Sequence, residues 1–240
     1  MAVTAAIFLC CVGVTARPAW GGGKDDATVI LFSGTDIWRN GAFLYGGLLA
    51  APRGLNRDGF FLKLLFSVGA YRYNAGSLGG VEITGGQAIG AFLPGWRIKR
   101  GNFEAKFFAG PDLEYHSLWP DDPGNNLRGT VIGLRVAAEL WYEPTPSTMV
   151  AANGSLATIA GNNNARLAAG WHVLDDFMGG FYVGPELQYF NSYGYRHWRF
   201  GAHLTGLKTG KNEWSAGAGW AQDSDERSGP YLRLDFLTRR

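Results

Sequence analysis

The sequence is poor in cysteine, and its cysteines lie next to each other near the start. Cys10 and Cys11 are the only two cysteines among 240 residues. They lie within Ala2–Val14, an apolar stretch with small residues that is typical of the hydrophobic part of a secretory signal. We therefore expect residues 1–22 to be a signal peptide, whose cleavage site the pattern does not fix, and residues 23–240 to form one mature domain. Cleavage would leave no cysteine, so the stability of that domain cannot depend on disulfides.

Long apolar runs and apolar stripes at helical spacing are also missing. The first segment is shorter than the ~20 residues that a transmembrane helix needs. No later stretch is long and uncharged enough to replace it, and none repeats its apolar residues with a helical period. If the chain crosses a membrane, it must do so with β-strands.

The chain carries no large excess of charge of either sign. It has 22 Lys and Arg residues against 20 Asp and Glu residues, for a formal net charge of +2. This near balance gives no electrostatic reason to expect nucleic acid as a partner, and we expect none.

Histidine is scarce, and its spacing does not suit a metal site. Two of the 4 histidines, His197 and His203, fall on one face of a predicted strand. Six residues of extended chain separate them by ~20 Å, at ~3.3 Å per residue, which is too far to share a metal ion. We expect no metal and no other cofactor.

What the sequence does have is alternation of apolar and polar residues. In a strand, successive side chains point to opposite faces, so alternation gives one apolar and one polar face. The segment His197–Gly206 shows the pattern most clearly. One face carries Trp198, Phe200, Ala202 and Leu204, and the other carries His197, Arg199, His203 and Thr205. The chain therefore reads as all-β.

The alternating runs recur along the whole chain and are separated by Gly, Pro, Asn and Asp clusters, which are typical of turns. Asn40-Gly41 suits a tight hairpin, and 94–101 is expected to be a turn region. The regular spacing predicts an antiparallel up-and-down meander of about twelve strands. The predicted strands are residues 28–37, 42–51, 59–71, 80–93, 102–115, 129–142, 148–159, 165–174, 180–190, 197–207, 213–222 and 229–238.

Full charges of both signs recur in the middle of the polar faces. A soluble barrel would have to bury them, which is costly unless each charge is paired. A membrane barrel avoids that cost, because its polar face lines the lumen and its apolar face contacts lipid. We therefore expect an antiparallel up-and-down transmembrane β-barrel. Its expected lumen-lining residues are Lys63, Glu104, Lys106, Arg135, Glu139, Arg166, His172, Glu186, Arg199, His203 and Arg233.

Large aromatic residues near the ends of the predicted strands support the membrane interpretation, because interfacial girdles are built from them. The expected girdle residues are Trp38, Tyr71, Tyr73, Trp96, Trp119, Trp141, Tyr142, Trp171, Trp198, Trp214 and Trp220. The last strand, Arg227–Phe236, also resembles the terminal recognition signal of outer-membrane barrels, although residues 237–240 follow its aromatic residue. An ordinary edge strand is the alternative interpretation of this segment.

Two loop regions carry aromatic residues beside polar groups. Such pairs can stack on a sugar ring and bind its hydroxyl groups, but interfacial aromatics and polar turns explain them as well. The candidate glucan-contact residues at the outer rim are Trp119, Asp121, Asp122, Tyr193 and Tyr195.

No catalytic motif is present. A lipid-modifying barrel enzyme would need a serine and a histidine together with a third polar group. Ser215 and His203 lie on adjacent predicted strands, but both are expected to face the lumen, where polar residues are common lining. We expect no catalytic residues.

Several short motifs resemble one family, the cellulose biosynthesis accessory protein BcsS of Gram-negative bacteria. They include Phe32-Ser-Gly34, Arg57-Asp58-Gly59-Phe60, Gly69-Ala-Tyr71-Arg-Tyr73, Tyr142-Glu-Pro144-Thr145 and Gly184-Pro185-Glu186, followed by the run Tyr195–Gly206. Together they cover most of residues 28–236. The resemblance implies an outer-membrane protein associated with cellulose production, and the family has no established catalytic residues to carry over.

We therefore expect a non-catalytic outer-membrane accessory protein of cellulose biosynthesis or export. Its expected partners are outer-membrane lipid and cellulose or other cellulose-secretion proteins. A general small-solute porin is the main alternative, and a lipid-modifying enzyme is a weaker one. Charges that only fill the lumen and charges that form a track for substrate are equally compatible with the pattern.

Overall fold

The computed structural model describes residues 27–192 and 195–240, which form twelve β-strands. The predicted signal peptide lies outside the described residues. The strands are β1 (Val29–Trp38), β2 (Gly41–Ala50), β3 (Gly59–Ala75), β4 (Val81–Arg100), β5 (Phe103–Trp119), β6 (Gly129–Thr145), β7 (Thr148–Ala157), β8 (Asn163–Val173), β9 (Phe181–Ser192), β10 (Tyr195–Thr209), β11 (Asn212–Asp223) and β12 (Ser228–Arg239). Two short 3-10 turns, η1 (Gly76–Leu78) and η2 (Ile159–Gly161), lie between strands. The all-β prediction and the predicted strand number are confirmed.

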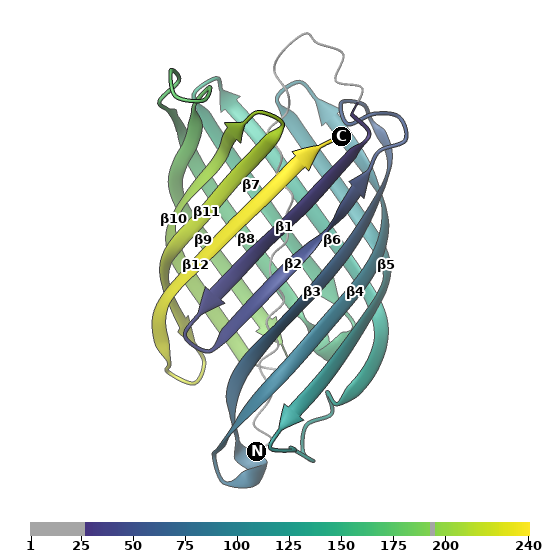
Figure 1. Cartoon of the computed structure of the whole chain (residues 1–240), viewed down its shortest axis with the longest axis vertical. Coiled ribbons are helices and arrows are strands. Elements are labelled where there is room, and N and C mark those ends of the chain that lie inside the picture. Colours follow the sequence, from purple (N-terminus) through teal and green to yellow (C-terminus); the bar gives the residue numbers. More distant parts are fainter. Residues whose placement is uncertain (1–26, 193–194) are drawn as a thin grey trace.

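The strands form a closed antiparallel barrel (Figure 1). Each strand pairs with its neighbours in the chain. The ring is closed by β1 and β12, whose register begins where Ile30 lies opposite Arg239 and ends where Trp38 lies opposite Tyr231. Closure matters because it leaves no strand edge with unpaired backbone groups. Over the described residues, the chain has no helix that is long and apolar enough to cross a membrane.

The strands are strongly tilted. We followed the paired residues from strand to strand once around the barrel, starting from Glu104 on β5. The path returns to β5 at Leu118, so the stagger is 118 − 104, or 14 residues. For twelve strands this stagger corresponds to a tilt of about 40°.

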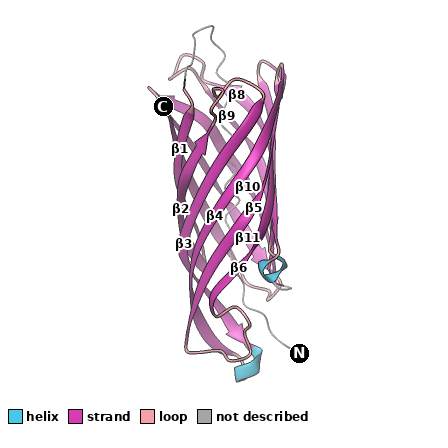
Figure 2. Ribbon diagram, turned by 90° about the vertical axis from the view of Figure 1, so that its right-hand side faces the viewer, coloured by secondary structure: helices cyan, strands magenta, loops and turns pink. Residues whose placement is uncertain are grey.

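The barrel is flattened, being broader in Figure 1 than in Figure 2, which is turned by 90°. We call β12, β1, β2 and β3, which face the viewer in Figure 1, the front wall. The rear wall is formed by β6 to β9. In the ring order, β1 lies six strands from β7, and β2 lies six strands from β8. The two walls therefore face each other across the short dimension.

The two ends of the barrel differ. The C-terminal end holds the start of β1 and the end of β12, and lies at the top in Figure 1. The distal end holds the β3–β4 hairpin with η1 and the β5–β6 connection, residues 120–128. Strands β3 to β5 extend furthest at this end (Figure 1).

Side chains alternate between the two faces of the wall as the sequence predicts. Phe200 on β10 is 68% exposed on the outer face, whereas its neighbour Arg199 is 1% exposed on the inner face. The outer face also has a shallow apolar hollow of about 390 Å³ over β6 to β10, with Ala138 and Gly154 among its lining residues.

Four of the expected girdle residues were wrongly placed on the lipid face. Trp38, Tyr71, Tyr73 and Trp141 are buried inside the barrel. Their position in the alternation explains this, because Trp38 is two residues from the inward-facing Asp36 and therefore shares its face. Several others are exposed on the outer face, namely Trp96, Trp119, Tyr142, Trp171, Trp198 and Trp220.

The turn predicted over 94–101 was also wrong. β4 continues to Arg100, so only residues 101 and 102 connect it to β5. Pro94 lies inside β4 and pairs with Leu62 of β3. The β4–β5 register is interrupted between Ala91 and Gly95, because proline has no N–H to donate to the ladder.

Candidate functional site

The interior of the barrel gathers most of the charged residues predicted to line a lumen. All of them except His172 are buried on the inner face. His172 is half-buried near the end of β8. The contacts among these residues divide the interior into two charge networks. We call the place between the two networks, where Asn153 lies, the seam.

The β3–β6 network consists of Lys63, Arg97, Glu104, Lys106 and Glu139. Lys63 Nζ donates to Glu139 Oε1 at 2.6 Å, which joins β3 of the front wall to β6 of the rear wall. Lys106 Nζ bridges Glu104 at 3.0 Å and Glu139 at 3.4 Å. Arg97 Nη2 lies 3.6 Å from Glu104 Oε2. Every charge in this network has an opposite charge beside it.

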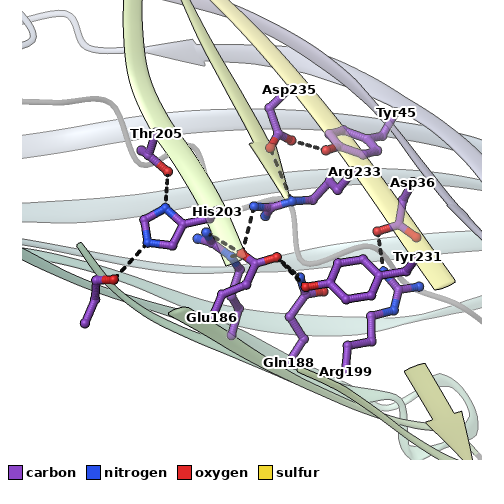
Figure 3. Close-up of polar contacts among 12 residues, drawn as sticks. Asp36, Tyr45, Glu186, Gln188, Arg199, His203, Thr205, Tyr231, Arg233 and Asp235 are labelled. Carbon is purple, nitrogen blue, oxygen red and sulfur yellow. Dashed lines mark hydrogen bonds and ion pairs between the residues drawn. The ribbon is translucent and has the colours of Figure 1, made fainter. Parts of the chain in front are cut away.

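The β8–β12 network is centred on Glu186 and consists of Arg166, Glu186, Gln188, Tyr231 and Arg233 (Figure 3). Arg166 Nε donates to the Glu186 carboxylate at 2.8 Å, and Arg233 Nη2 donates to it at 3.1 Å. The Tyr231 hydroxyl and the Gln188 amide each donate to Glu186 Oε1 at 2.8 Å. One carboxylate therefore joins β8 and β9 of the rear wall to β12 of the front wall.

Further ion pairs flank this network. Arg199 Nη1 donates to Asp36 Oδ2 at 2.6 Å, linking β10 to β1 (Figure 3). The Tyr45 hydroxyl donates to Asp235, which lies 3.4 Å from Arg233 Nε. The Arg199–Asp36 and Tyr45–Asp235 contacts again connect strands that are not neighbours in the sheet.

A third cluster lies nearer the distal end. Arg135 Nη2 donates to Asp112 and also to Glu114 Oε1, the latter at 3.3 Å. Glu114 Oε2 is 3.0 Å from His116 Nε2 and accepts from Gln87 Nε2 at 3.1 Å. The charges here are also paired within the barrel.

Asn153 occupies the seam between the two networks. It is paired in register with Glu139 on β6 and with Arg166 on β8, so the three side chains share the inner face. Glu139 turns away to the two lysines, and Arg166 turns away to Glu186. Asn153 is 8% exposed, and neither its Nδ2 nor its Oδ1 has a hydrogen-bond partner among the described residues.

The front wall carries many aromatic rings on its inner face, beside the charges of Asp36, Lys63 and Arg233 that reach the networks. Its buried rings include Phe32, Phe43, Tyr45, Tyr71 and Tyr231. Two of these rings lie over a glycine of the neighbouring strand. A Cβ at Gly85 would lie 2.3 Å from Cζ of Tyr71, and a Cβ at Gly34 would lie 2.4 Å from the Tyr45 hydroxyl. These glycines let the rings lie against the wall.

At the distal end, the rim residues predicted to contact glucan have different environments. Trp119 is 79% exposed. Asp121 is exposed and accepts from Arg128 Nη1 at 3.1 Å. Asp122, by contrast, is buried and accepts from the Tyr73 hydroxyl and Ser77 Oγ, both at 2.8 Å.

The second predicted rim pair is only partly described. Tyr195 is buried at the start of β10, and its hydroxyl donates to Asp223 Oδ2 at 2.9 Å. Tyr193 lies outside the described residues.

Burial raises the pKa of Asp225, in the adjacent β11–β12 connection, above its ordinary value, although Arg227 opposes that shift. At the opposite end, the Arg100 guanidinium and the Lys99 N–H lower the pKa of Asp58.

The histidines do not form a catalytic or metal-binding group. His203 Nδ1 is 2.9 Å from Thr205 Oγ1, and His203 Nε2 lies 3.1 Å from the Ala169 carbonyl oxygen, to which it can donate. The partners of the imidazole are therefore Thr205 and the Ala169 carbonyl, and neither is Ser215. His172 Nδ1 lies 2.5 Å from Asp175. Over residues 27–192 and 195–240, no group of three or more His, Cys, Asp or Glu residues could hold a metal.

Sequence reasoning missed several interior residues that complete these clusters. The partners Asp36 and Tyr231 were not expected, nor was Asn153. The alternation along the strands could have placed Asp36 and Tyr231 inside the barrel. Tyr231, for example, is two residues from the predicted lumen residue Arg233 and therefore shares its face. The sequence has no signal for the unpartnered amide of Asn153, because that depends on where its neighbours turn.

Comparison with known proteins gives a family and a fold. The family model for cellulose biosynthesis protein BcsS matches residues 30–240. The COG4313 outer membrane channel from Pseudomonas putida F1 is similar in structure, with 12% sequence identity and a TM-score of 0.57, over 95% of this chain and 100% of that chain. The KdgM porin aligns with 13% identity and a TM-score of 0.44, over 87% and 98% of the two chains. No curated protein matches the sequence significantly. At such low identities the structural likeness concerns the barrel fold alone.

Proposed function

This chain belongs to the cellulose biosynthesis protein BcsS family, and from that premise we propose that it is a non-catalytic outer-membrane accessory protein that contacts the glucan chain during cellulose production. The observation that carries the proposal is the extent of the family match. The matched residues 30–240 run from the second residue of β1 through the end of β12. We therefore assign the role of the family to the barrel and its loops.

The outer face supports a location in the outer membrane. Large apolar residues such as Phe66, Val136 and Phe200 are exposed there at mid-strand. Water would make such a surface costly, whereas lipid accommodates it. An even number of antiparallel strands also places the start of β1 and the end of β12 at one end, which is typical of outer-membrane barrels.

The interior supports binding of a sugar chain without catalysis. Aromatic rings can pack against the C–H faces of a pyranose, and amide and hydroxyl groups can bond its hydroxyls. The interior acids and bases are engaged with one another, as in the Glu186 cluster. A general acid or base would need access to a substrate proton.

At the distal rim we propose that Trp119 and Asp121 also contact the emerging glucan. The Trp119 ring is exposed at the end of β5, and Asp121 is two residues further along the chain. The oxygens of Asp122 are already used by Tyr73 and Ser77, so Asp122 positions this loop.

Deletion and complementation test this function. Cells lacking the protein should secrete less cellulose, measured as glucose released by cellulase, and the wild-type chain should restore it. An epitope-tagged chain should fractionate with the outer membrane and migrate faster on a gel when unheated. Unchanged cellulose output, or recovery in a soluble fraction, would contradict the proposal. Steady conductance in planar bilayers that cello-oligosaccharides do not block would favour a general porin.

A further inference from the structure

We propose that the seam between the two charge networks is a subsite for a neutral, hydroxyl-rich glucan chain, with the Asn153 carboxamide as its hydrogen-bonding group. This inference rests on the proposed function, because glucan contact supplies the ligand class. It goes further by naming the place inside the barrel and the group that binds.

The amide of Asn153 has no hydrogen-bond partner among the described residues. Asn153 points inward with Glu139 and Arg166 on either side in register. Both neighbours are held by charges elsewhere, and Asn153 is more than nine-tenths buried, with neither polar atom of its amide paired among residues 27–192 and 195–240. A buried amide in this condition is unfavourable unless a further group pairs with it. A ligand hydroxyl, which donates and accepts, complements the carboxamide.

The charges beside Asn153 bear on the charge of the ligand. The two neighbours carry opposite charges, and each already has an opposite charge beside it: Glu139 has two lysines, and Arg166 has Glu186, which it shares with Arg233. An anion or a cation entering the seam would be attracted by one neighbour and repelled by the other. A neutral ligand loses nothing on this account, which favours an uncharged sugar chain over an acidic one.

Neutral polar groups continue along β7 beyond Asn153. Ser155 lies two residues beyond Asn153 on β7, on the same inner face. Its Oγ accepts from Asn164 Nδ2 at 2.8 Å and from Arg135 Nη1 at 3.3 Å. Hydroxyl and amide groups therefore extend from the seam toward the distal end.

The front wall lies opposite Asn153. β7, which carries Asn153, lies six strands from β1, so the front wall faces the seam across the short dimension of the barrel. Interior rings of that wall, including Tyr45 and Tyr231, appear in Figure 3. A pyranose has hydroxyls at its edge and C–H groups on its faces, and the two walls offer a complement to each.

The test uses the full chain purified in detergent and cellohexaose as the probe, with binding measured by calorimetry. Asn153→Leu should weaken cellohexaose binding by about tenfold or more, because it removes both hydrogen-bonding atoms. Asn153→Gln keeps the carboxamide and should stay within about threefold of wild type. Asn191→Leu, the same chemical change on the outer face of β9, should leave the affinity unchanged. Faster migration of each unheated variant on a gel reports that it has folded.

The outcomes separate the subsite from the proposed function. If cellohexaose binds the wild type and folded Asn153→Leu equally well, the subsite is wrong while glucan contact stands. If the folded wild-type barrel binds no cellohexaose at all, glucan contact by the purified barrel and the subsite both fail. Equal losses in Asn153→Leu and Asn191→Leu would also contradict the subsite, because the effect would not depend on which face carries the amide.

Discussion

The front and rear walls of this barrel obey the same alternation, but their inward positions are filled in different ways. On the front wall, rings such as Tyr71 and Tyr45 lie over glycines of the next strand. On the rear wall, charges such as Glu139 and Glu186 meet charges on other strands. The front wall therefore depends mainly on close steric fit, and the rear wall depends on electrostatic pairing.

This difference has a consequence for binding. Rings that lie against a wall leave apolar surface, whereas paired charges leave little net field. The proposed subsite between such walls would suit a ligand that is apolar on one side and polar but uncharged on the other. Changes to each wall should consequently have different physical signatures, which three variants can separate.

The largest effect is expected on the rear wall, at Glu186. Glu186→Gln removes the one carboxylate that pairs with both Arg166 and Arg233. Arg166 then loses the carboxylate beside it and Arg233 keeps its contact with Asp235, which should lower the free energy of unfolding by about 3 kcal/mol. Urea unfolding from lipid vesicles measures this. The control Glu82→Gln changes a carboxylate that is 61% exposed and should cost less than about 0.5 kcal/mol. Equal costs for the two variants would show that the network is not electrostatic in origin.

A smaller and steric effect is expected at the edge of the front wall, where Tyr71 of β3 lies over Gly85 of the neighbouring β4. Gly85→Ala places a methyl group against the Tyr71 ring and should cost about 2 kcal/mol. The control Gly90→Ala, on the same strand, meets no atom closer than 3.9 Å and should cost less than about 1 kcal/mol.

A double-mutant cycle sharpens this point. In a Tyr71→Ala background the ring is gone, so the added cost of Gly85→Ala should fall below about 0.5 kcal/mol. Equal costs of Gly85→Ala with and without the Tyr71 ring would mean that glycine is needed there for another reason.

The smallest effect on stability is expected outside both walls, at the distal rim. Asp121→Asn breaks a pair with Arg128 in which both side chains are exposed, so the free energy of unfolding should change by less than about 0.5 kcal/mol. Its effect should instead appear in cellulose retained by cells, if the proposed rim contact is correct. A stability loss comparable to that of Glu186→Gln would place Asp121 in the fold and not in binding.

The strand pattern could be predicted because period-two alternation and turn residues are local properties of the chain. The same alternation was enough to place Arg199 inside and Phe200 outside. The errors at Trp38 and Trp141 arose where residue type was followed in preference to phase. Trp141 lies two residues from Glu139 and shares its inward face.

The pairings inside the barrel could not be predicted in the same way. Lys63 meets Glu139 across three strands of the ring, 76 residues apart in the chain. That contact depends on the stagger of the strands and on the flattening of the barrel, neither of which the sequence states. The seam at Asn153 depends in turn on these pairings, because its neighbours must turn away to expose it.

The most direct measurement of the account is photo-cross-linking with a diazirine derivative of cellohexaose, followed by peptide mapping of the labelled residues. If glucan lies between the two walls, labels should appear at inward positions of β1 to β3 and of β6 to β9, with Asn153 and Ser155 among them, and also at the distal rim. Labels confined to outward positions such as Phe200, or the absence of labels inside the barrel, would contradict the claim that glucan lies between the two walls.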